Sequence, residues 1–284
     1  MASNTDAERI ALSQRSGSAN LVWAFVERQT NLWKRYWAWE LVWLVYGVVN
    51  TLAITFIAEE AQAAGLTADA SGLVLFLLLG TLVWAYLSAV LDDISLVITW
   101  ERWEGTIEHT LMAPVPRSLH LIGMCVFGIL HAIARTLLIF FIALPFFDVG
   151  LGQADWVSAA AVIAVGSISV AGLGILTGVL PLLYPERGTQ MSFMLQAIVL
   201  LVSGVYYSVD VLPPWLQVFS YVSPATYILD GIRGAIIDGE GLASVADTLL
   251  ILLGFGVVMV PGGIAVFAVA ERWAKKTGRL KRQG

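Results

Sequence analysis

Long apolar runs alternate with short polar segments over most of the chain. A helix of about 20 apolar residues crosses the hydrocarbon core of a bilayer, and six runs approach or exceed that length. They cover residues 37–58, 72–97, 119–141, 157–180, 189–207 and 246–270. Because the bilayer core offers no water to unpaired backbone groups, such runs form helices. The pattern predicts an all-α polytopic membrane protein with six transmembrane helices.

The segment before the first run mixes polar and apolar residues at helical spacing. In residues 21–36, Leu21, Phe25 and Leu32 recur on one side, and charged and amide side chains fill much of the rest. This pattern is typical of an amphipathic helix lying at the membrane surface. The alternative is that the segment is simply the start of the first span, and its charge density argues against that.

Composition places the chain among integral membrane proteins. Apolar residues make up 58% and charged residues 13% of its 284 residues, whereas soluble domains carry roughly 25% charged residues. The single cysteine, Cys125, excludes an intramolecular disulfide. The expected organisation is a disordered cytoplasmic tail, one transmembrane domain and a basic cytoplasmic tail. These cover residues 1–19, 20–275 and 276–284.

The basic residues predict the orientation. Fourteen Lys and Arg residues lie in the two terminal segments and in the connections that follow the second and fourth runs, against Arg233 alone in the other connections. The positive-inside rule then places both termini in the cytoplasm. The even number of spans agrees with this orientation, and the expected location is the plasma membrane.

A polar island, residues 100–118, separates the second run from the third. Gly105 is expected to interrupt the arriving helix, and the Thr106 hydroxyl to cap a new short helix. Pro114 and Pro116 cannot continue that helix, so it ends near residue 113. A short helix between stiff turns is suited to receiving a push from a soluble partner. A plain solvated loop fits the same residues equally well.

The segment 203–236 is too apolar for a free loop and too interrupted for a span. Pro213 and Pro214 are expected to open one short helix, and Pro224 to end it and begin a second. Both would re-enter the outer leaflet, buried by protein. Asp230 and Arg233 lie three residues apart, which allows them to pair. The residues of this segment that we call the outer gate are Pro213, Trp215, Pro224, Tyr227, Asp230 and Arg233.

Charged residues inside the predicted spans call for partners. Arg135 lies about 16 residues into the third span, with His131 one turn earlier, and a charge at that depth costs roughly 2.5–3.5 kcal/mol. These two residues either line a substrate path or meet a carboxylate of a neighbouring span, unless Arg135 extends to the outer interface. Glu40, near the inner end of the first span, either meets cytoplasmic basic residues or is hydrated.

Several kinds of chemistry are not expected of this chain. It has no Gly-x-x-x-x-Gly-Lys-Ser/Thr phosphate loop. His109, His120 and His131 are dispersed, so we expect no metal site, and no Ser-His-Asp arrangement points to a catalytic residue. Membrane lipids are expected partners and nucleic acid is not.

Two groups of motifs carry a family resemblance over residues 20–275. The first is Glu101-Arg-Trp-Glu-Gly-Thr-Ile-Glu followed by a Pro-Val turn, and the second is Leu212-Pro-Pro-Trp-Leu with Ser223-Pro-Ala-Thr-Tyr and Asp230-Gly-Ile-Arg. Together with six spans, they resemble the permease of a type-2 ABC exporter. Ser208 departs from the proline of many relatives, which puts a kink after the fifth span in doubt.

The resemblance implies an exporter of hydrophobic or amphiphilic substrates, such as drugs, lipids or glycolipids. It also implies a second copy of the chain or a homologous permease, and a separate ABC ATPase that binds ATP and Mg, so that this chain holds no cofactor. The short helix would be the coupling helix that docks on the ATPase. Its expected residues are Glu101, Glu104, Gly105, Thr106, Ile107, Glu108, Leu111 and Pro114. The competing interpretation is an ion-coupled carrier or channel without an ATPase, although no inverted repeat is visible.

Overall fold

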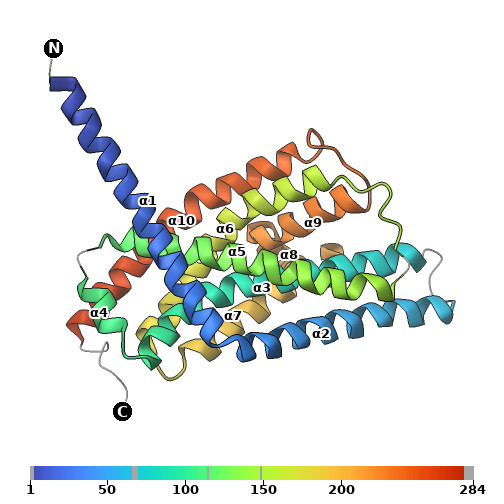
Figure 1. Cartoon of the computed structure of the whole chain (residues 1–284). Helices are drawn as coiled ribbons and strands as arrows, with labels where there is room; N and C mark the ends of the chain where they lie inside the picture. Colours follow the sequence, from blue (N-terminus) through green and yellow to red (C-terminus); the bar gives the residue numbers. More distant parts are fainter. Residues whose placement is uncertain (1–2, 66–69, 114, 148, 278–284) are drawn as a thin grey trace.

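The structure is a computed structural model that describes residues 3–65, 70–113, 115–147 and 149–277. Within these ranges every regular element is helical, as the hydropathy pattern predicts (Figure 1). The elements are α1 (Ser3–Arg35), α2 (Trp37–Ala63), α3 (Ala70–Trp103), α4 (Ile107–Met112), α5 (Arg117–Ala143), η1 (Leu144–Phe146), α6 (Trp156–Leu183), α7 (Gly188–Val202), η2 (Val209–Val211), α8 (Pro214–Val222), α9 (Pro224–Ile236) and α10 (Ala246–Lys276).

Five described helices are long and apolar enough to cross a membrane, namely α2, α3, α5, α6 and α10. The fifth expected span, residues 189–207, corresponds to α7, which has only 15 residues. Its predicted end at residue 207 is wrong, because Gly204 adopts a φ of +70° and turns the chain out of the helix after Ser203. At 1.5 Å per residue α7 reaches about 22 Å, which is less than the hydrocarbon thickness.

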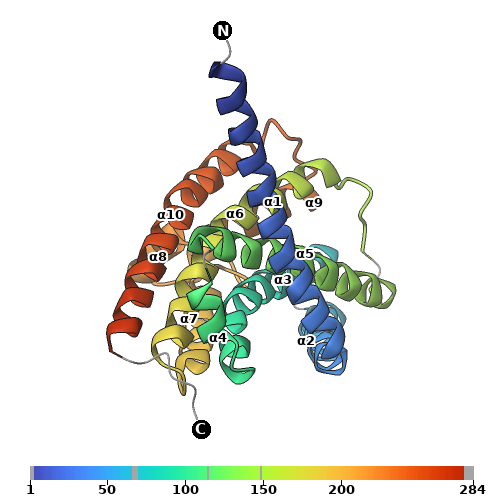
Figure 2. The ribbon, with the colours of Figure 1, turned by 60° about the vertical axis from the view of Figure 1, so that its left-hand side comes forward.

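Helix α3 forms the centre of the bundle and contacts α2, α5, α6, α7 and α9. Its buried face includes Tyr86, Leu87, Leu91 and Ile94. Helices α2 and α10 lie on opposite sides of the bundle, and each exposes most of its apolar surface (Figures 1 and 2). The larger buried apolar cluster of the described residues lies around α3 and α6, and a smaller one lies between α2, α3 and α5.

Small residues on α6 allow its neighbours to approach closely, as in other membrane helix pairs. A Cβ added at Gly174 would lie 2.5 Å from Cδ1 of Ile94 on α3, whereas one added at Gly178 would meet nothing nearer than 3.8 Å. On the α10 side, a Cβ at Gly172 would lie 2.6 Å from Cβ and 2.7 Å from the carbonyl carbon of Met259. Backbone, rather than a mobile side-chain end, fills the space beside Gly172.

Gly172→Ala should therefore destabilise the bundle, since α10 must move to admit the methyl group. Overpacking of this kind costs about 1–3 kcal/mol. Gly178→Ala is the matched control, and should leave the midpoint of thermal unfolding unchanged or raise it, because alanine favours helix by up to about 1 kcal/mol. The midpoint is measured in detergent for both variants. Equal stability of the two would contradict the close α6–α10 contact.

The N-terminal segment differs from its prediction. The structure has helix from Ser3 onward, whereas residues 1–19 were expected to be disordered. The physical reason is that this segment contains Ala, Glu, Arg and Gln, which favour helix, and no proline. The amphipathic segment 21–36 is helical as predicted, and a turn at Tyr36 separates it from α2. Helix α1 crosses α5 on the outside of the bundle (Figure 2).

The expected pair of short helices before the last span is present as α8 and α9. Pro214 is the first residue of α8 and Pro224 the first residue of α9, so the prolines open these helices as predicted. Helix α9 packs against α6, α3 and α10 and is largely buried, while α8 touches the bundle mainly through α7 and α9. Residues 278–284, most of the predicted basic tail, lie outside the described part of the chain.

Candidate functional site

The short helix α4 exists because a glycine ends α3. Gly105 has a φ of +72°, and its N–H donates to the Arg102 carbonyl at 3.1 Å. The Thr106 N–H donates to the Glu101 carbonyl at 2.9 Å. These two bonds form a Schellman ending, which satisfies carbonyls that the helix leaves free. The predicted interruption at Gly105 is confirmed.

The predicted cap at Thr106 is wrong in its chemistry. Thr106 occupies the residue before α4, but its hydroxyl makes no bond to the N–H groups of that helix. The hydroxyl instead accepts a hydrogen bond from Nη2 of Arg28 at 3.1 Å. Ile107, 2% exposed, anchors α4 to the core. Pro114 and the side chains of Glu108 and Leu111 lie outside the described part of the structure.

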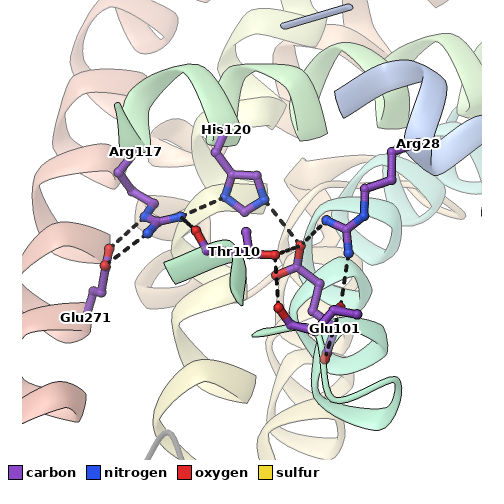
Figure 3. A network of polar contacts seen from close by, with 7 residues as sticks. Arg28, Glu101, Thr110, Arg117, His120 and Glu271 are labelled. Carbon is purple, nitrogen blue, oxygen red and sulfur yellow. Dashed lines mark hydrogen bonds and ion pairs between the residues drawn. The ribbon is translucent and has the colours of Figure 1, made fainter. Parts of the chain in front are cut away.

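Glu101 is the centre of a polar network around α4 (Figure 3). Its side chain is 2% exposed, and its Oε1 lies 2.6 Å from Nη1 of Arg28 on α1. The hydroxyl of Thr110, on α4, donates to the same oxygen at 3.3 Å. Nε2 of His120, on α5, lies 3.5 Å from it. One buried carboxylate thus joins α1, α3, α4 and α5.

Arg117 extends the network to α10. Its Nε and Nη2 donate to the two carboxylate oxygens of Glu271 at 2.9 and 3.2 Å. Its Nη1 lies 3.4 Å from the Thr110 carbonyl on α4 and 3.4 Å from Nδ1 of His120. Lys275 adds a contact to Glu271 at 2.8 Å. Two-pronged bonds of this kind fix orientation as well as distance.

We call these residues the α4 network: Arg28, Glu101, Thr106, Thr110, Arg117, His120 and Glu271. The sequence predicted Glu101 and Thr106 as site residues and missed the other five. Glu104, which was also predicted, takes no part in the hydrogen bonds and ion pairs that join these described residues. The network connects α4 through polar contacts to α1, α3, α5 and α10. Breaking such a buried charged contact is costly, because one charge is left without its partner.

A second polar cluster surrounds His131 and Arg135. Nδ1 of His131 lies 2.6 Å from Oδ2 of Asp93 on α3. Glu40, on α2, approaches both cations, with its Oε1 3.3 Å from Nε2 of His131 and 3.9 Å from Nη1 of Arg135. Arg135 therefore meets a carboxylate of a neighbouring helix, and the alternative of extension to the outer interface is wrong. Likewise, Glu40 pairs with His131 and Arg135 of α5 and not with cytoplasmic basic residues.

The expected pair between Asp230 and Arg233 is not formed. Arg233 donates from Nη1 to the Gly204 carbonyl at 2.9 Å and from Nη2 to the Val205 carbonyl at 2.7 Å. Its guanidinium carbon lies 3.5 Å from the centre of the Phe76 ring. Asp230 is exposed on the same helix. The carbonyls left free by the turn after α7 thus bind Arg233, whereas the spacing along α9 predicted Asp230 as its partner.

The remaining gate residues divide into two groups. Pro213 and Pro224 precede or open the short helices, as expected. Tyr227 donates from its hydroxyl to the Tyr221 carbonyl at 3.1 Å, which ties α9 to α8. Trp215, by contrast, is 66% exposed. Among these residues, the side chains of Arg233 and Tyr227 fix the relative positions of α7, α8 and α9.

Comparison with known proteins adds a family model and curated relatives. Residues 20–237 match the model described as "ABC-2 type transporter". The chain is 24% identical over 241 residues to the protein named "Inner membrane transport permease YadH" of Escherichia coli (strain K12) and to its namesake in Shigella flexneri. The alignment covers 84% of this chain and 88% of each relative. The family match includes every residue of the α4 network except Glu271.

Proposed function

Since the chain belongs to the ABC-2 type transporter family and is therefore a non-catalytic membrane subunit of an ABC transporter, we propose that it exports a hydrophobic or amphiphilic substrate. The substrate would leave the cytoplasm or the inner leaflet. A separate ATPase subunit would bind ATP and Mg and supply the motion. The observation that carries the proposal is the α4 network, because it gives a soluble partner a mechanical connection to the membrane helices.

In this mechanism α4 is the coupling helix that docks on the ATPase. It lies at one end of the bundle, between α3 and α5 (Figure 1). A push on α4 acts on α3 and α1 through Glu101, and on α5 and α10 through Arg117. A loop without these contacts would absorb the push by local bending. Closure of the ATPase pair would then reach the substrate path as a movement of whole helices.

A functional unit would contain two permeases, either two copies of this chain or this chain and a homologue. Helix α2 exposes large apolar side chains, including Val42 and Tyr46, and α7 exposes Met194 and Ile198. Lipid or a second permease would cover these faces. The substrate would leave between the two permeases, and the α8–α9 pair would close the exit until late in the cycle.

The distribution of ATP turnover tests the proposal. The purified chain should not hydrolyse ATP, because it lacks a phosphate-binding loop. Co-expression with its ATPase should give a complex of two permeases and two ATPases, measured by light scattering after size exclusion, with ATP turnover that depends on the ATPase. Robust turnover by the chain alone would overturn this assignment. Transport driven by an ion gradient without the ATPase would support the competing carrier.

A further inference from the structure

A small cavity of about 110 Å³ lies between α1, α2, α3 and α5, around the His131 cluster. Three carboxylates line it, from Glu40, Asp92 and Asp93, together with the cationic side chains of His131 and Arg135. Six aromatic side chains form much of the remaining wall, and they are Trp33, Tyr36, Trp39, Trp43, Trp100 and Phe127. The α4 network does not include any of these residues.

The charges in this cavity do not balance. Glu40 and Asp93 have His131 and Arg135 as partners. Asp92 accepts a hydrogen bond from the neutral amide of Gln196 at 2.6 Å, and it appears in none of the ion pairs formed by described residues. Carboxylates therefore outnumber cationic groups by three to two, even with His131 protonated. A carboxylate away from water is stable only when a cation or several donors compensate it.

Contacts with carboxylates and rings hold the two cationic groups of the cavity in place. Nε2 of His131 lies 3.3 Å from Oε1 of Glu40, and Nη1 of Arg135 lies 3.9 Å from the same oxygen. The His131 side chain is nine-tenths buried, between the ring of Phe127, stacked at 5.6 Å, and the ring of Trp33, which meets it edge-on at 5.6 Å. His131 and Arg135 are thus engaged by Glu40 and Asp93, and Asp92 is the carboxylate of the cavity that has no ion-pair partner among the described residues.

The aromatic walls indicate which cation fits. Aromatic faces attract organic ammonium groups, and cages of several rings bind quaternary ammonium ions. The rings of Trp33 and Phe127 pack against His131. The rings of Trp39 and Trp43, on α2, line the cavity and form no ring contact with His131. The described residues form no group of His, Cys, Asp and Glu side chains that could hold a metal ion. An ammonium head group meets both requirements, the unmatched carboxylate and the aromatic surface.

We propose that this cavity binds the ammonium head group of an amphiphile, with its positive charge beside Asp92 and against the aromatic walls. The alkyl part would leave the cavity along the exposed apolar side of α2, which includes Val42 and Val45. The ligand is either a membrane lipid with a choline head or a free cationic amphiphile. This inference rests on the proposed function only where the bound molecule is cargo, since binding itself requires neither ATP nor the ATPase.

The test uses the full-length chain in nanodiscs made from an uncharged glycolipid. The probe is radiolabelled octyltrimethylammonium below its micellar concentration, and the competitor is the isosteric neutral compound in which a tert-butyl group replaces the trimethylammonium group. The wild-type chain should bind the ammonium compound about tenfold or more tightly than its neutral isostere, as expected of a desolvated cation on aromatic rings beside a carboxylate. Equal affinities would overturn the proposal.

Asp92→Asn should abolish most of that preference. The asparagine keeps its size and can still accept the hydrogen bond from Gln196, so the fold is retained. Glu59→Gln, near the far end of α2 and outside the cavity, is the matched control and should bind as wild type. Preference retained in Asp92→Asn would show that this carboxylate does not face a cation, and the proposal would fail.

Two tryptophan variants test the aromatic wall separately. Trp43→Leu should weaken binding of the ammonium compound by about three- to tenfold while changing the neutral isostere less. Trp23→Leu, at an exposed position on α1 outside the cavity, should change neither. Equal losses for the two compounds in Trp43→Leu would indicate plain apolar packing and would contradict recognition of the charge.

A second bilayer distinguishes the two sources of the head group. In nanodiscs of phosphatidylcholine, a lipid occupant would compete with the probe and lower its apparent affinity several-fold relative to the glycolipid bilayer. Equal affinity in the two bilayers would identify a free amphiphile as the ligand. Both bilayers carry no net charge, so the comparison does not alter the surface concentration of the cation. Either outcome supports the site, whereas no binding in either bilayer would overturn it.

Discussion

Replacing Arg233 by methionine is expected to give the largest loss of stability of any single change considered for this chain. The arginine is 9% exposed and binds the carbonyls of Gly204 and Val205 while lying over the Phe76 ring. Methionine fills similar space but leaves two carbonyls without donors, and each buried unpaired group costs about 1–3 kcal/mol. We expect the midpoint of thermal unfolding to fall by about 5–10 °C.

Three controls separate this explanation from others. Arg233→Lys should be intermediate, because a single ammonium cannot reproduce the fork that reaches both carbonyls. Asp230→Asn should be close to wild type, since Asp230 is not the partner of the arginine. Arg187→Met, at an exposed position, should have little effect. A stable Arg233→Met variant, or an Asp230→Asn variant as damaged as it, would contradict the contact with the turn after α7.

Local sequence signals were sufficient for most of the fold. The apolar runs correspond to α2, α3, α5, α6 and α10, because a bilayer-length run has few other structures available. Gly105 and the prolines before α8 and α9 were read correctly, since their backbone preferences act over a few residues. The end of α7 was missed because Val205–Tyr207 is apolar and extends the hydropathy run past Gly204. Glycine after the last helical turn was the available signal.

The site depends on contacts that sequence spacing does not reveal. Arg28 and Glu101 are 73 residues apart, and Arg117 and Glu271 are 154 residues apart. A single sequence carries no signal that identifies two such distant residues as partners. The i, i+3 rule even misled for Arg233, since the free carbonyls of a tertiary turn were better acceptors than the neighbouring aspartate. The sequence did predict that charges inside the spans need partners, and the contact between Arg135 and Glu40 agrees with that prediction.

Glu101→Gln should uncouple ATP hydrolysis from the membrane helices. The amide keeps its size but loses the charge that holds Arg28 at 2.6 Å and His120 at 3.5 Å. Removing one partner of a buried ion pair costs up to about 3–5 kcal/mol, and less here because Arg28 is 30% exposed. We expect the change in ATP turnover that the permease imposes on its ATPase to shrink about tenfold, with membrane insertion retained.

Glu104→Gln is the matched control for this prediction, because it removes a carboxylate three residues away that has no part in the α4 network. Turnover of its complex should match wild type. In a double-mutant cycle, the combined loss in Arg28→Gln with Glu101→Gln should be smaller than the sum of the two single losses, since both changes break the Arg28–Glu101 contact and only Arg28→Gln also removes the bond to Thr106. Additive losses would show that the two residues act separately. An equal defect in Glu104→Gln would assign the effect to surface charge at the ATPase contact and not to the link between α1 and α3.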